Sequence, residues 1–444
     1  MKQDQELVRS VMRSSKSLST LQISHRALSD AEILEQSLND YIGIIPECQC
    51  LQKLILTRVN NLSQATIDTI ADVLNNKESS LKILDLSNGF GGEEPTDVVK
   101  IAQALNTNGT LEELDLSKRI LANDDCISAF AKTIESNSGL KRLDLQVGRF
   151  GGNDLISPDA WIPIGNALAT ATAASKTSSS TLEYLDISNY QISESSWKAL
   201  AEGLKSNTSL LTLKAERPYS EKNEEITETD FLLPIFEMLR ENKTLQTLHL
   251  TGYNLSDSSI KSLETLALVL AGENNTSLKS LKLDGSSMTD NGVAILSQGL
   301  PKMKGLEHLD LNHHSFSQKG AQTFAKGMAT NYSLLSVGIG QTYRHGYSTG
   351  YVPPLSANGF EKEYHEIQYY TRLNRKGRRC WSQAPLPPRL WSLVLERAME
   401  KEKPLGPLCT KDVRREDKFA GNQHDVSIDA VYFLLRNVMT LPVE

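Results

Sequence analysis

Acidic side chains recur at one fixed position of this chain, and their spacing would let them act together. They are Asp85, Asp115, Asp144 and Asp186. If the segments that carry them form neighbouring parallel strands, about 4.8 Å apart, the carboxylates form a ladder. Neighbouring like charges repel by on the order of 1 kcal/mol in water, so the ladder raises carboxylate pKa values unless cations intervene. The pattern therefore predicts an acidic stripe that could bind a basic partner.

A second interpretation of the aspartates stays open. Leu-Asp-Leu-Ser can be the ordinary strand of a repeat, with its charge neutralised by nearby cations. The candidate cations are Lys82, Lys118, Lys141 and Arg142. On this interpretation the aspartates support the fold and have no ligand.

Histidines form the other group with possible chemistry. His308 and Asp310 are two residues apart and so share one face of a strand, and His249 occupies the fifth position two strands earlier. Such a group could bind a metal ion or make partner binding sensitive to pH. Histidines and carboxylates on a sheet are more often only solvated, so we expect no metal site and no cofactor.

Motifs of the common hydrolases are missing. The chain has no G-x-S-x-G, and His365-Glu366 is not followed by the second histidine of H-E-x-x-H. We therefore expect no catalytic residues and no enzymatic activity of this kind.

The elements that position these residues follow from an eleven-fold frame, L-x-x-L-x-[L/I/A]. Its first residues are Leu18, Leu51, Leu81, Leu111, Leu140, Leu182, Leu210, Leu245, Leu278, Leu306 and Leu334. Most gaps lie near 28–33 residues, with a helical pattern in the second half of each unit. This period predicts an α/β leucine-rich-repeat solenoid, a horseshoe with a parallel inner sheet, outer helices and a helical C-terminal cap.

One unit shows the expected structure. Leu111, Leu114 and Leu116 point inward from a strand, Asp124 or Asp125 caps a helix, and the helix buries an apolar stripe. Six units place an asparagine three residues before the next strand frame, where we expect a left-handed helix stop. These are Asn108, Asn137, Asn207, Asn242, Asn275 and Asn331.

The strand–turn–helix unit with N-x-[S/T]-L junctions resembles the ribonuclease-inhibitor-like class of leucine-rich repeats, over about 320 residues. That class includes sensor domains of NOD-like receptors and Ran GTPase-activating proteins. The chain departs from the class at the ninth position, which usually holds asparagine, so its turns must satisfy their backbone differently. The ninth residues are Arg26, Val59, Gly89, Arg119, Gly148, Tyr190, Pro218, Tyr253, Ser286, His314 and Thr342.

The resemblance leaves two functions open. The first is a non-enzymatic scaffold that binds a protein through the concave face and one rim. The second is a GTPase-activating protein of the Ran-directed type, which needs an exposed loop arginine to stabilise charge in phosphoryl transfer. Arg58, Arg119 and Arg149 are the candidates for that role, although no matching motif surrounds them.

Two insertions mark the rim, at 148–159 and 216–230. Together with the concave columns they define the residues that we expect to contact a partner. These are Asp85, Asp115, Asp144, Asp186, Tyr184, His249, His308, Asp310, Arg149 and Arg217.

Charge and composition limit the partner. The net charge is −7, of which the first 342 residues carry −11 and the rest +4. An acidic arc disfavours nucleic acid as the main ligand. The N-terminus has no apolar signal region and no 18-residue apolar run occurs, so we expect a cytoplasmic monomer without a membrane span. The five cysteines are scattered, and reduced thiols are expected.

The chain divides into four expected parts, which are an N-terminal helical cap (1–17), the repeats (18–341), a linker (342–358) and a helical C-terminal cap (359–444). The tail segments YYTRLNRKGRR, PPRLWSLVLERA and DAVYFLLRN resemble the tail of leucine-rich-repeat proteins of diatoms and related microalgae. Its basic cluster from Arg372 to Arg379 would suit either a nuclear-localisation signal or a solvated helix end.

Overall fold

A computed structural model gives the fold of the protein. It describes residues 10, 12, 14, 15, 18–24, 38–48, 50–57, 62–87, 95–148, 155–173, 181–217, 231–272, 275, 277–340 and 361–375. The expected N-terminal cap therefore lies largely outside the described residues. The expected linker and the two later tail segments also lie outside the described residues.

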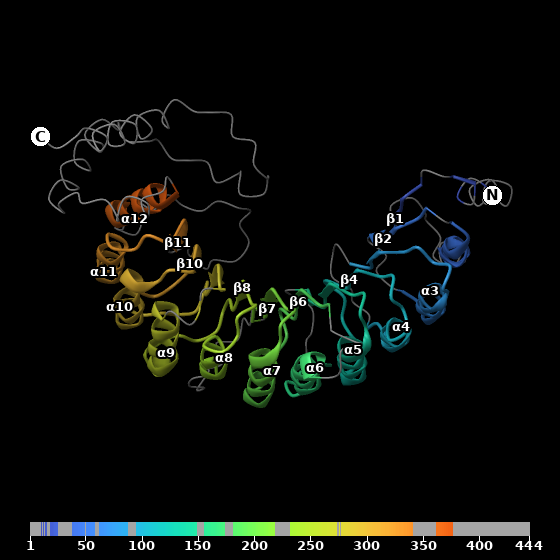
Figure 1. Ribbon diagram of the computed structural model, residues 1–444, viewed down its shortest axis with the longest axis horizontal. Coiled ribbons are helices and arrows are strands. Elements are labelled where there is room, and N and C mark those ends of the chain that lie inside the picture. The colour runs from blue at the N-terminus through green and yellow to red at the C-terminus, as the bar shows by residue number, and fades with distance from the viewer. Residues whose placement is uncertain are drawn as a thin grey trace, which may run out of the picture.

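The described strands form one parallel sheet in strict chain order, β1 to β11, so each strand pairs with the strands of the repeats before and after it. The sheet lines the inside of an arc and the helices cover its outside (Figure 1). The strands are β1 (Thr20–Ser24), β2 (Lys53–Thr57), β3 (Ile83–Asp85), β4 (Glu113–Asp115), β5 (Arg142–Asp144), β6 (Tyr184–Asp186), β7 (Thr212–Lys214), β8 (Thr247–His249), β9 (Ser280–Lys282), β10 (His308–Asn312) and β11 (Ser336–Gly340). The leucine-rich-repeat solenoid predicted from the eleven-fold frame is confirmed.

One helical segment follows most strands. The α-helices are α3 (Gln64–Asn75), α4 (Val99–Leu105), α5 (Asp124–Ser136), α6 (Ile162–Ala173), α7 (Glu194–Ser206), α8 (Leu233–Met238), α9 (Ile260–Ala271), α10 (Asp290–Gly299), α11 (Gln318–Met328) and α12 (Glu361–Arg375). Short 3-10 helices add η2 (Ile45–Glu47), η3 (Asp257–Ser259) and η4 (Leu300–Lys302). None of the described helices combines the length and apolar character that a membrane crossing requires.

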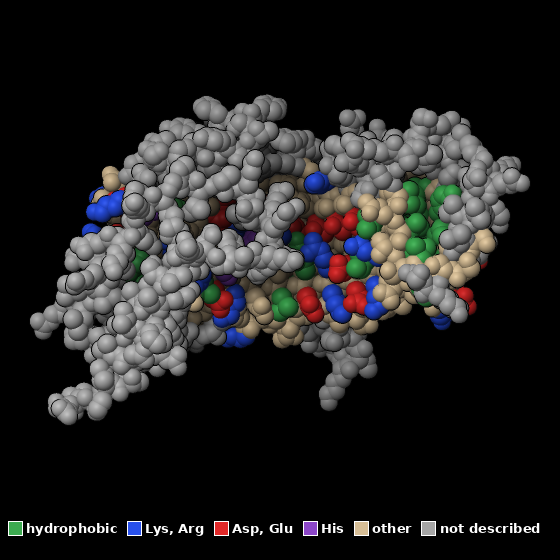
Figure 2. Space-filling view, turned by 90° about the horizontal axis from the view of Figure 1, so that it is seen from above, with side chains coloured by type: hydrophobic (Ala, Val, Ile, Leu, Met, Phe, Trp, Pro, Cys, Tyr) green, Lys and Arg blue, Asp and Glu red, His purple; other side chains and the backbone are tan. Residues whose placement is uncertain are grey.

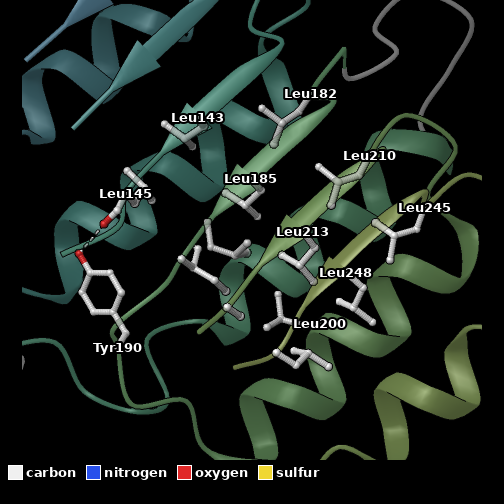
Figure 3. Packing of buried hydrophobic residues seen from close by; sticks show 14 of the residues in the cluster. Leu143, Leu145, Leu182, Leu185, Tyr190, Leu200, Leu210, Leu213, Leu245 and Leu248 are labelled. Atoms are coloured by element: carbon white, nitrogen blue, oxygen red, sulfur yellow. Dashed lines mark hydrogen bonds between the residues drawn. The ribbon is translucent and has the colours of Figure 1, made fainter. Parts of the chain in front are cut away.

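The core lies between the sheet and the helices. In the second and later units the fourth and sixth frame residues, such as Leu114 and Leu116, are buried beneath the strand, whereas Leu21 and Ile23 of the first unit are only partly buried. Leu143, Leu185, Leu213 and Leu248 continue this stack from strand to strand (Figure 3). Because the inward positions are filled by leucine, the residues between them face the concave side.

Asparagine at the helix–strand junctions works differently from our expectation. Asn137 and Asn207 have φ of −85° and −69°, so their backbone is extended and not left-handed. In Asn242 the side-chain nitrogen donates to the Leu204 carbonyl of the preceding repeat at 2.7 Å, and its oxygen accepts from the backbone of Thr244 and Leu245. The junction asparagines therefore join successive repeats through buried hydrogen bonds.

The start of α5 also corrects the sequence prediction. Its N-cap is Asn123, whose side chain accepts from the Asp125 amide, and Asp124 is the first helical residue. The Asp124 carboxylate instead accepts from the Ser157 amide and hydroxyl of the next repeat, at 2.8 and 2.6 Å. This carboxylate therefore links two repeats.

At some turns the ninth-position side chain takes the place of asparagine. The Tyr190 hydroxyl donates to the Leu145 carbonyl of the preceding repeat at 2.9 Å (Figure 3). The Ser286 hydroxyl donates to the carbonyl of Leu283 at 2.7 Å. These two turns thus use the hydrogen-bonding group of their own ninth residue.

Helix α12 covers the end of the last repeat. Ile367 is fully buried, the Gln368 side chain donates to the Val337 carbonyl, and the Asn374 side chain donates to the Leu334 carbonyl, both at 2.9 Å. The helix therefore seals β11 with the same kind of contact that one repeat makes with the next.

Candidate functional site: the concave face

Two columns of side chains cross the concave face. The register aligns the first residues of the short strands in one column, including Glu113, Arg142 and Tyr184, and the third residues in another. Figure 2 shows this face, with hydrophobic side chains towards its N-terminal end and adjoining acidic and basic side chains near its middle. The four predicted aspartates do lie side by side in the second column.

Each aspartate of this column has a structural role. The Asp115 carboxylate accepts from the Ser117 amide at 2.8 Å, and Asp85 and Asp186 make the same bond to the residue two positions on. Such a bond ends a strand by satisfying a backbone donor that would otherwise lack a partner. The turn therefore explains the recurrence of Leu-Asp-Leu-Ser. The second interpretation of the sequence assigned the aspartates to the fold, but it expected neutralising cations and not this hydrogen bond.

The central aspartates are not a surface stripe, which corrects the first interpretation. Asp144 and Asp186 are only 5% and 4% exposed. Arg142 donates to the Asp144 carboxylate at 2.8 Å, and the Tyr184 hydroxyl donates to the Asp186 carboxylate at 3.1 Å. The column beside the aspartates carries larger side chains at these two strands, and those side chains cover them.

Tyr184 lies between cations from the strands on either side. The Arg142 guanidinium carbon is 3.6 Å from the centre of the Tyr184 ring, and the Lys214 ammonium is 5.1 Å from it. The same ammonium lies 3.9 Å from the Asp186 carboxylate. We call Arg142, Asp144, Tyr184, Asp186 and Lys214 the central cluster.

Burial sets the protonation of the central cluster. Burial, together with the neighbouring carboxylates of Asp186 and Asp115, raises the pKa of Asp144 to about 7 against the opposing effect of Arg142. Burial likewise raises the pKa of Asp186 and that of the Tyr184 phenol. The pair of buried aspartates therefore binds a proton more readily than free aspartates do.

The lysines named as neutralising cations have other partners. Lys82 and Lys141 both pair with Glu112, at 3.0 and 2.8 Å, just before β4 and at the opposite end of this strand from Asp115. Of the four cations, Arg142 is the one that pairs with an aspartate of the column. Local neutralisation therefore applies to the central aspartates and not to Asp115.

Basic residues follow the aspartates in the same column. Lys214, His249 and Lys282 are neighbours on β7, β8 and β9, and Lys282 pairs with Glu216 at 3.1 Å. Burial and the two flanking lysines lower the pKa of His249 to about 4. His249 is therefore neutral near pH 7, which argues against a histidine switch at this position.

The remaining histidines do not converge on one point. His308 is exposed in the first column of β10, while His249 lies two strands away in the second column. His314 is buried and its Nδ1 accepts from the Met288 amide at 3.1 Å. Within the described ranges, no three His, Cys, Asp or Glu side chains are placed to hold a metal ion.

Asp310 repeats the turn bond of the aspartate column. Its carboxylate accepts from both the amide and the side chain of Asn312, at 3.1 and 2.6 Å. Burial raises the pKa of Asp310. The structure thus places Asp310 at the far side of the basic residues, separated from the acidic strands.

The loop arginines fall into three situations. Arg119 is 1% exposed, and its Nε donates to the Leu86 carbonyl of the preceding repeat. Arg119 acts as a ninth-position turn residue and is not an exposed loop arginine. This corrects the expectation that it could be the loop arginine of a GTPase-activating protein. Arg58 and Arg149 lie outside the described residues. Arg217 is partly exposed beside Gly252 on the rim.

Lys214 and Lys282 were not selected from the sequence, and Arg142 was considered only as a counter-ion. Their importance depends on which side chain lies outermost, and this follows from contacts between neighbouring strands. Aligning the two columns by repeat, with Tyr184 between Arg142 and Thr212, is the signal that could have found them.

An eleven-stranded parallel sheet with outer helices and leucine-filled frames defines a leucine-rich-repeat solenoid. No family model matches the chain. The chain is 26% identical over 336 residues to the Tonsoku-like protein of Bos taurus. The match covers 73% of this chain and 21% of that protein, so the chain spans about a fifth of this relative's length.

Solved structures with some similarity to this chain include those of three other proteins. The chain is 17% identical to the complex of TLR13 with ssRNA13; the match covers 78% of this chain and 39% of that chain, with a TM-score of 0.39. It is 15% identical to leiomodin-1 actin-binding site 2, where the match covers 45% of this chain and 86% of that chain, with a TM-score of 0.25. It is 14% identical to the tropomodulin C-terminal domain of Caenorhabditis elegans, where the match covers 48% of this chain and 93% of that chain, with a TM-score of 0.28.

Proposed function

We propose that this protein is a non-enzymatic scaffold that binds a protein partner on its concave face and on the rim that carries the two insertions. The observation that carries the proposal is the central cluster, where Arg142 stacks on Tyr184 in the middle of a broad open sheet. Tyrosine and arginine are enriched among the residues that dominate protein interfaces. A contact here would be flanked on both sides by further strands.

The expected contact residues divide by position. Asp85, Asp115, Tyr184 and His249 are partly exposed on the concave face, whereas Asp144 and Asp186 support Tyr184 and Arg142 from beneath. Arg217 lies at the rim, and Arg149 lies outside the described residues. We propose that Arg142 and Tyr184 contact the partner directly.

The alternative, a GTPase-activating protein of the Ran-directed type, has no support from the described residues. Arg119 is buried in a turn, so its guanidinium would have to leave the core to reach a nucleotide. We therefore propose the scaffold alone.

Photo-crosslinking tests the scaffold. A photoreactive amino acid replaces Thr212 or Ser280, which are partly exposed on the concave face, or Glu264 or Leu268, which are exposed on α9. In cells of the source organism, the concave positions should crosslink to one protein that the α9 positions do not reach. Crosslinks from α9 alone would reject the concave face, and stimulated GTP hydrolysis by a Ran-type GTPase would reject the non-enzymatic scaffold.

A further inference from the structure

Two zones of opposite charge lie next to each other on the concave face. The acidic zone consists of Asp85, Glu113 and Asp115 on β3 and β4, all partly exposed. The basic zone consists of Arg142, Lys214 and Lys282 on β5, β7 and β9. The question is which of these charges a partner would meet first.

In the basic zone the cations lie outermost. The side chains of Arg142 and Lys214 are 33% and 30% exposed, while those of their partners Asp144 and Asp186 are 7% and 5% exposed. Lys282 is 28% exposed beside Glu216 at 25%. At Arg142 and Lys214 an approaching molecule therefore touches the cations and not the buried carboxylates beneath them, whereas at Lys282 it meets the Glu216 carboxylate as well.

In the acidic zone the carboxylates keep their charge exposed. Within the described part of the chain no ion pair joins Glu113 or Asp115 to a cation, and Lys82 and Lys141 pair with Glu112 instead. The nearby charges of Lys141 and Arg142 still act on Glu113 and Asp115. Asp85 faces the buried charge of Arg119, and its carboxylate also accepts from the Ser87 amide. This zone therefore presents partly exposed carboxylates whose charge is only partly compensated.

We infer that the scaffold's partner binds through a bipolar segment, with basic residues on the acidic zone and acidic residues on the basic zone. The inference rests on the proposed scaffold function and replaces a uniformly basic partner. From β4 to β7 or β9 is three to five strand spacings, about 14–24 Å. A helix spans that distance with about 10–16 residues, so one helix or short extended segment covers both zones.

Other partner chemistries fit the two zones less well. A uniformly basic segment would place its cations against Arg142 and Lys214, and like charges in contact disfavour binding. A nucleic acid would place phosphates against Asp85, Glu113 and Asp115. A bipolar segment is the arrangement that satisfies both zones.

Labelled synthetic peptides of about 14 residues test the inference, with binding measured by fluorescence anisotropy at low and high salt. The block peptide has a lysine half and a glutamate half. The controls are an alternating peptide of the same composition, an all-lysine peptide and an all-glutamate peptide. We expect the block peptide to bind at least about ten-fold more tightly than the alternating one, and salt to weaken it.

Two variants test each zone separately. Glu113→Lys adds charge to the acidic zone without removing a turn bond, and Lys282→Glu reverses one cation of the basic zone. Each variant should bind the block peptide about ten-fold more weakly than the wild type does. Glu113→Lys should also bind the all-glutamate peptide more tightly, and Lys282→Glu should bind the all-lysine peptide more tightly. Matched charge changes on α9, Lys261→Glu and Glu264→Lys, should leave the order of affinities unchanged, and circular dichroism confirms that each variant is folded.

Several results would overturn the bipolar segment. They are equal binding of block and alternating peptides, no binding of the block peptide at 1 mM (about −4 kcal/mol), and binding of the all-lysine peptide alone. If concave crosslinks persist in such a case, the scaffold stands and only the bipolar segment fails. If, in addition, photo-crosslinks form only from the α9 positions, both proposals fail.

Discussion

At the scale of single residues, one aspartate position has two environments. Asp115 and Asp144 occupy the same place in successive repeats and both accept from an amide two residues on. They differ because Arg142 and Tyr184 stand beside Asp144 and Asp186, and these large side chains exclude water from the central pair. The environment of each aspartate therefore depends on the side chain two residues before it on its own strand, and on the neighbouring strands.

Asp144 should make stability fall as pH rises. Its pKa is about 7 in the folded protein against an ordinary 3.8, so between these pH values the folded state holds a proton that the unfolded chain has lost. The free energy of unfolding then decreases with pH across this window, by on the order of a few kcal/mol in total. In urea titrations, Asp144→Asn should lack this decrease, so its unfolding free energy should rise relative to that of the wild type between about pH 4 and pH 7.

Asp85→Asn is the matched control for Asp144→Asn, because Asp85 makes the same turn bond and is partly exposed but lies on β3, two strands away from Asp144. Its unfolding free energy should follow the pH profile of the wild type. Parallel profiles for Asp144→Asn and the wild type would show that Asp144 does not bind the extra proton.

Arg119 should be a stability residue. Arg119→Ala removes a buried donor to the Leu86 carbonyl together with its packing, and we expect a loss of about 2–3 kcal/mol in unfolding free energy. Lys118→Ala, an exposed neighbour, should change it by less than about 0.5 kcal/mol. Unchanged stability in Arg119→Ala would show that the guanidinium is not part of the turn.

At the scale of elements, the sequence identified each repeat but not how neighbouring repeats join. The leucine frame predicted the strands because its spacing alternates buried and exposed positions. The junction asparagines were recognised, yet their extended backbone and their bonds to the preceding repeat were not. Asn242 donates to Leu204, 38 residues earlier, and no local pattern specifies such a partner.

Helices α6 and α7 pack closely at two glycines, Gly165 and Gly203. At Gly203 the effect of close packing and the effect of helix propensity have opposite signs. A Cβ added to Gly203 would lie 2.0 Å from the Gly165 carbonyl oxygen, so the two backbones touch. Propensity alone would make Gly203→Ala more stable by about 0.5–1 kcal/mol. The clash with rigid backbone reverses the sign, and we expect a loss of about 1–3 kcal/mol.

Thermal and urea unfolding measure this sign, with Gly109→Ala as the control, because an added Cβ there meets no atom within 4 Å. Gly109→Ala should be neutral or slightly stabilising. If Gly203→Ala also stabilises the protein, the helices are free to separate and the close contact does not limit them.

At the scale of the whole molecule, the horseshoe was predictable because the repeat frame alone determines it. The candidate site was predictable only as a surface. The columns could be aligned from the sequence. The order of exposure within the central cluster, however, follows from Arg142 pairing with Asp144 on its own strand and from Lys214 reaching across to Asp186 and Tyr184 on the neighbouring strand. The chemistry that a partner meets is therefore a property of several repeats together.

The last repeat should depend on α12, and the effect should stay local. In a solenoid each unit contacts only its neighbours, so a weakened end frays without unfolding the middle. The double variant Ile367→Ala, Asn374→Ala removes a fully buried side chain and a donor to the Leu334 carbonyl. We expect faster amide hydrogen exchange in β11 and α11, by about ten-fold or more, with β3 to β6 unchanged.

Lys362→Ala, which is exposed on the same helix, should leave all strands unchanged. Uniform acceleration along the sheet would mean that the arc unfolds as one cooperative unit, and no acceleration at β11 would mean that α12 does not stabilise the end of the solenoid.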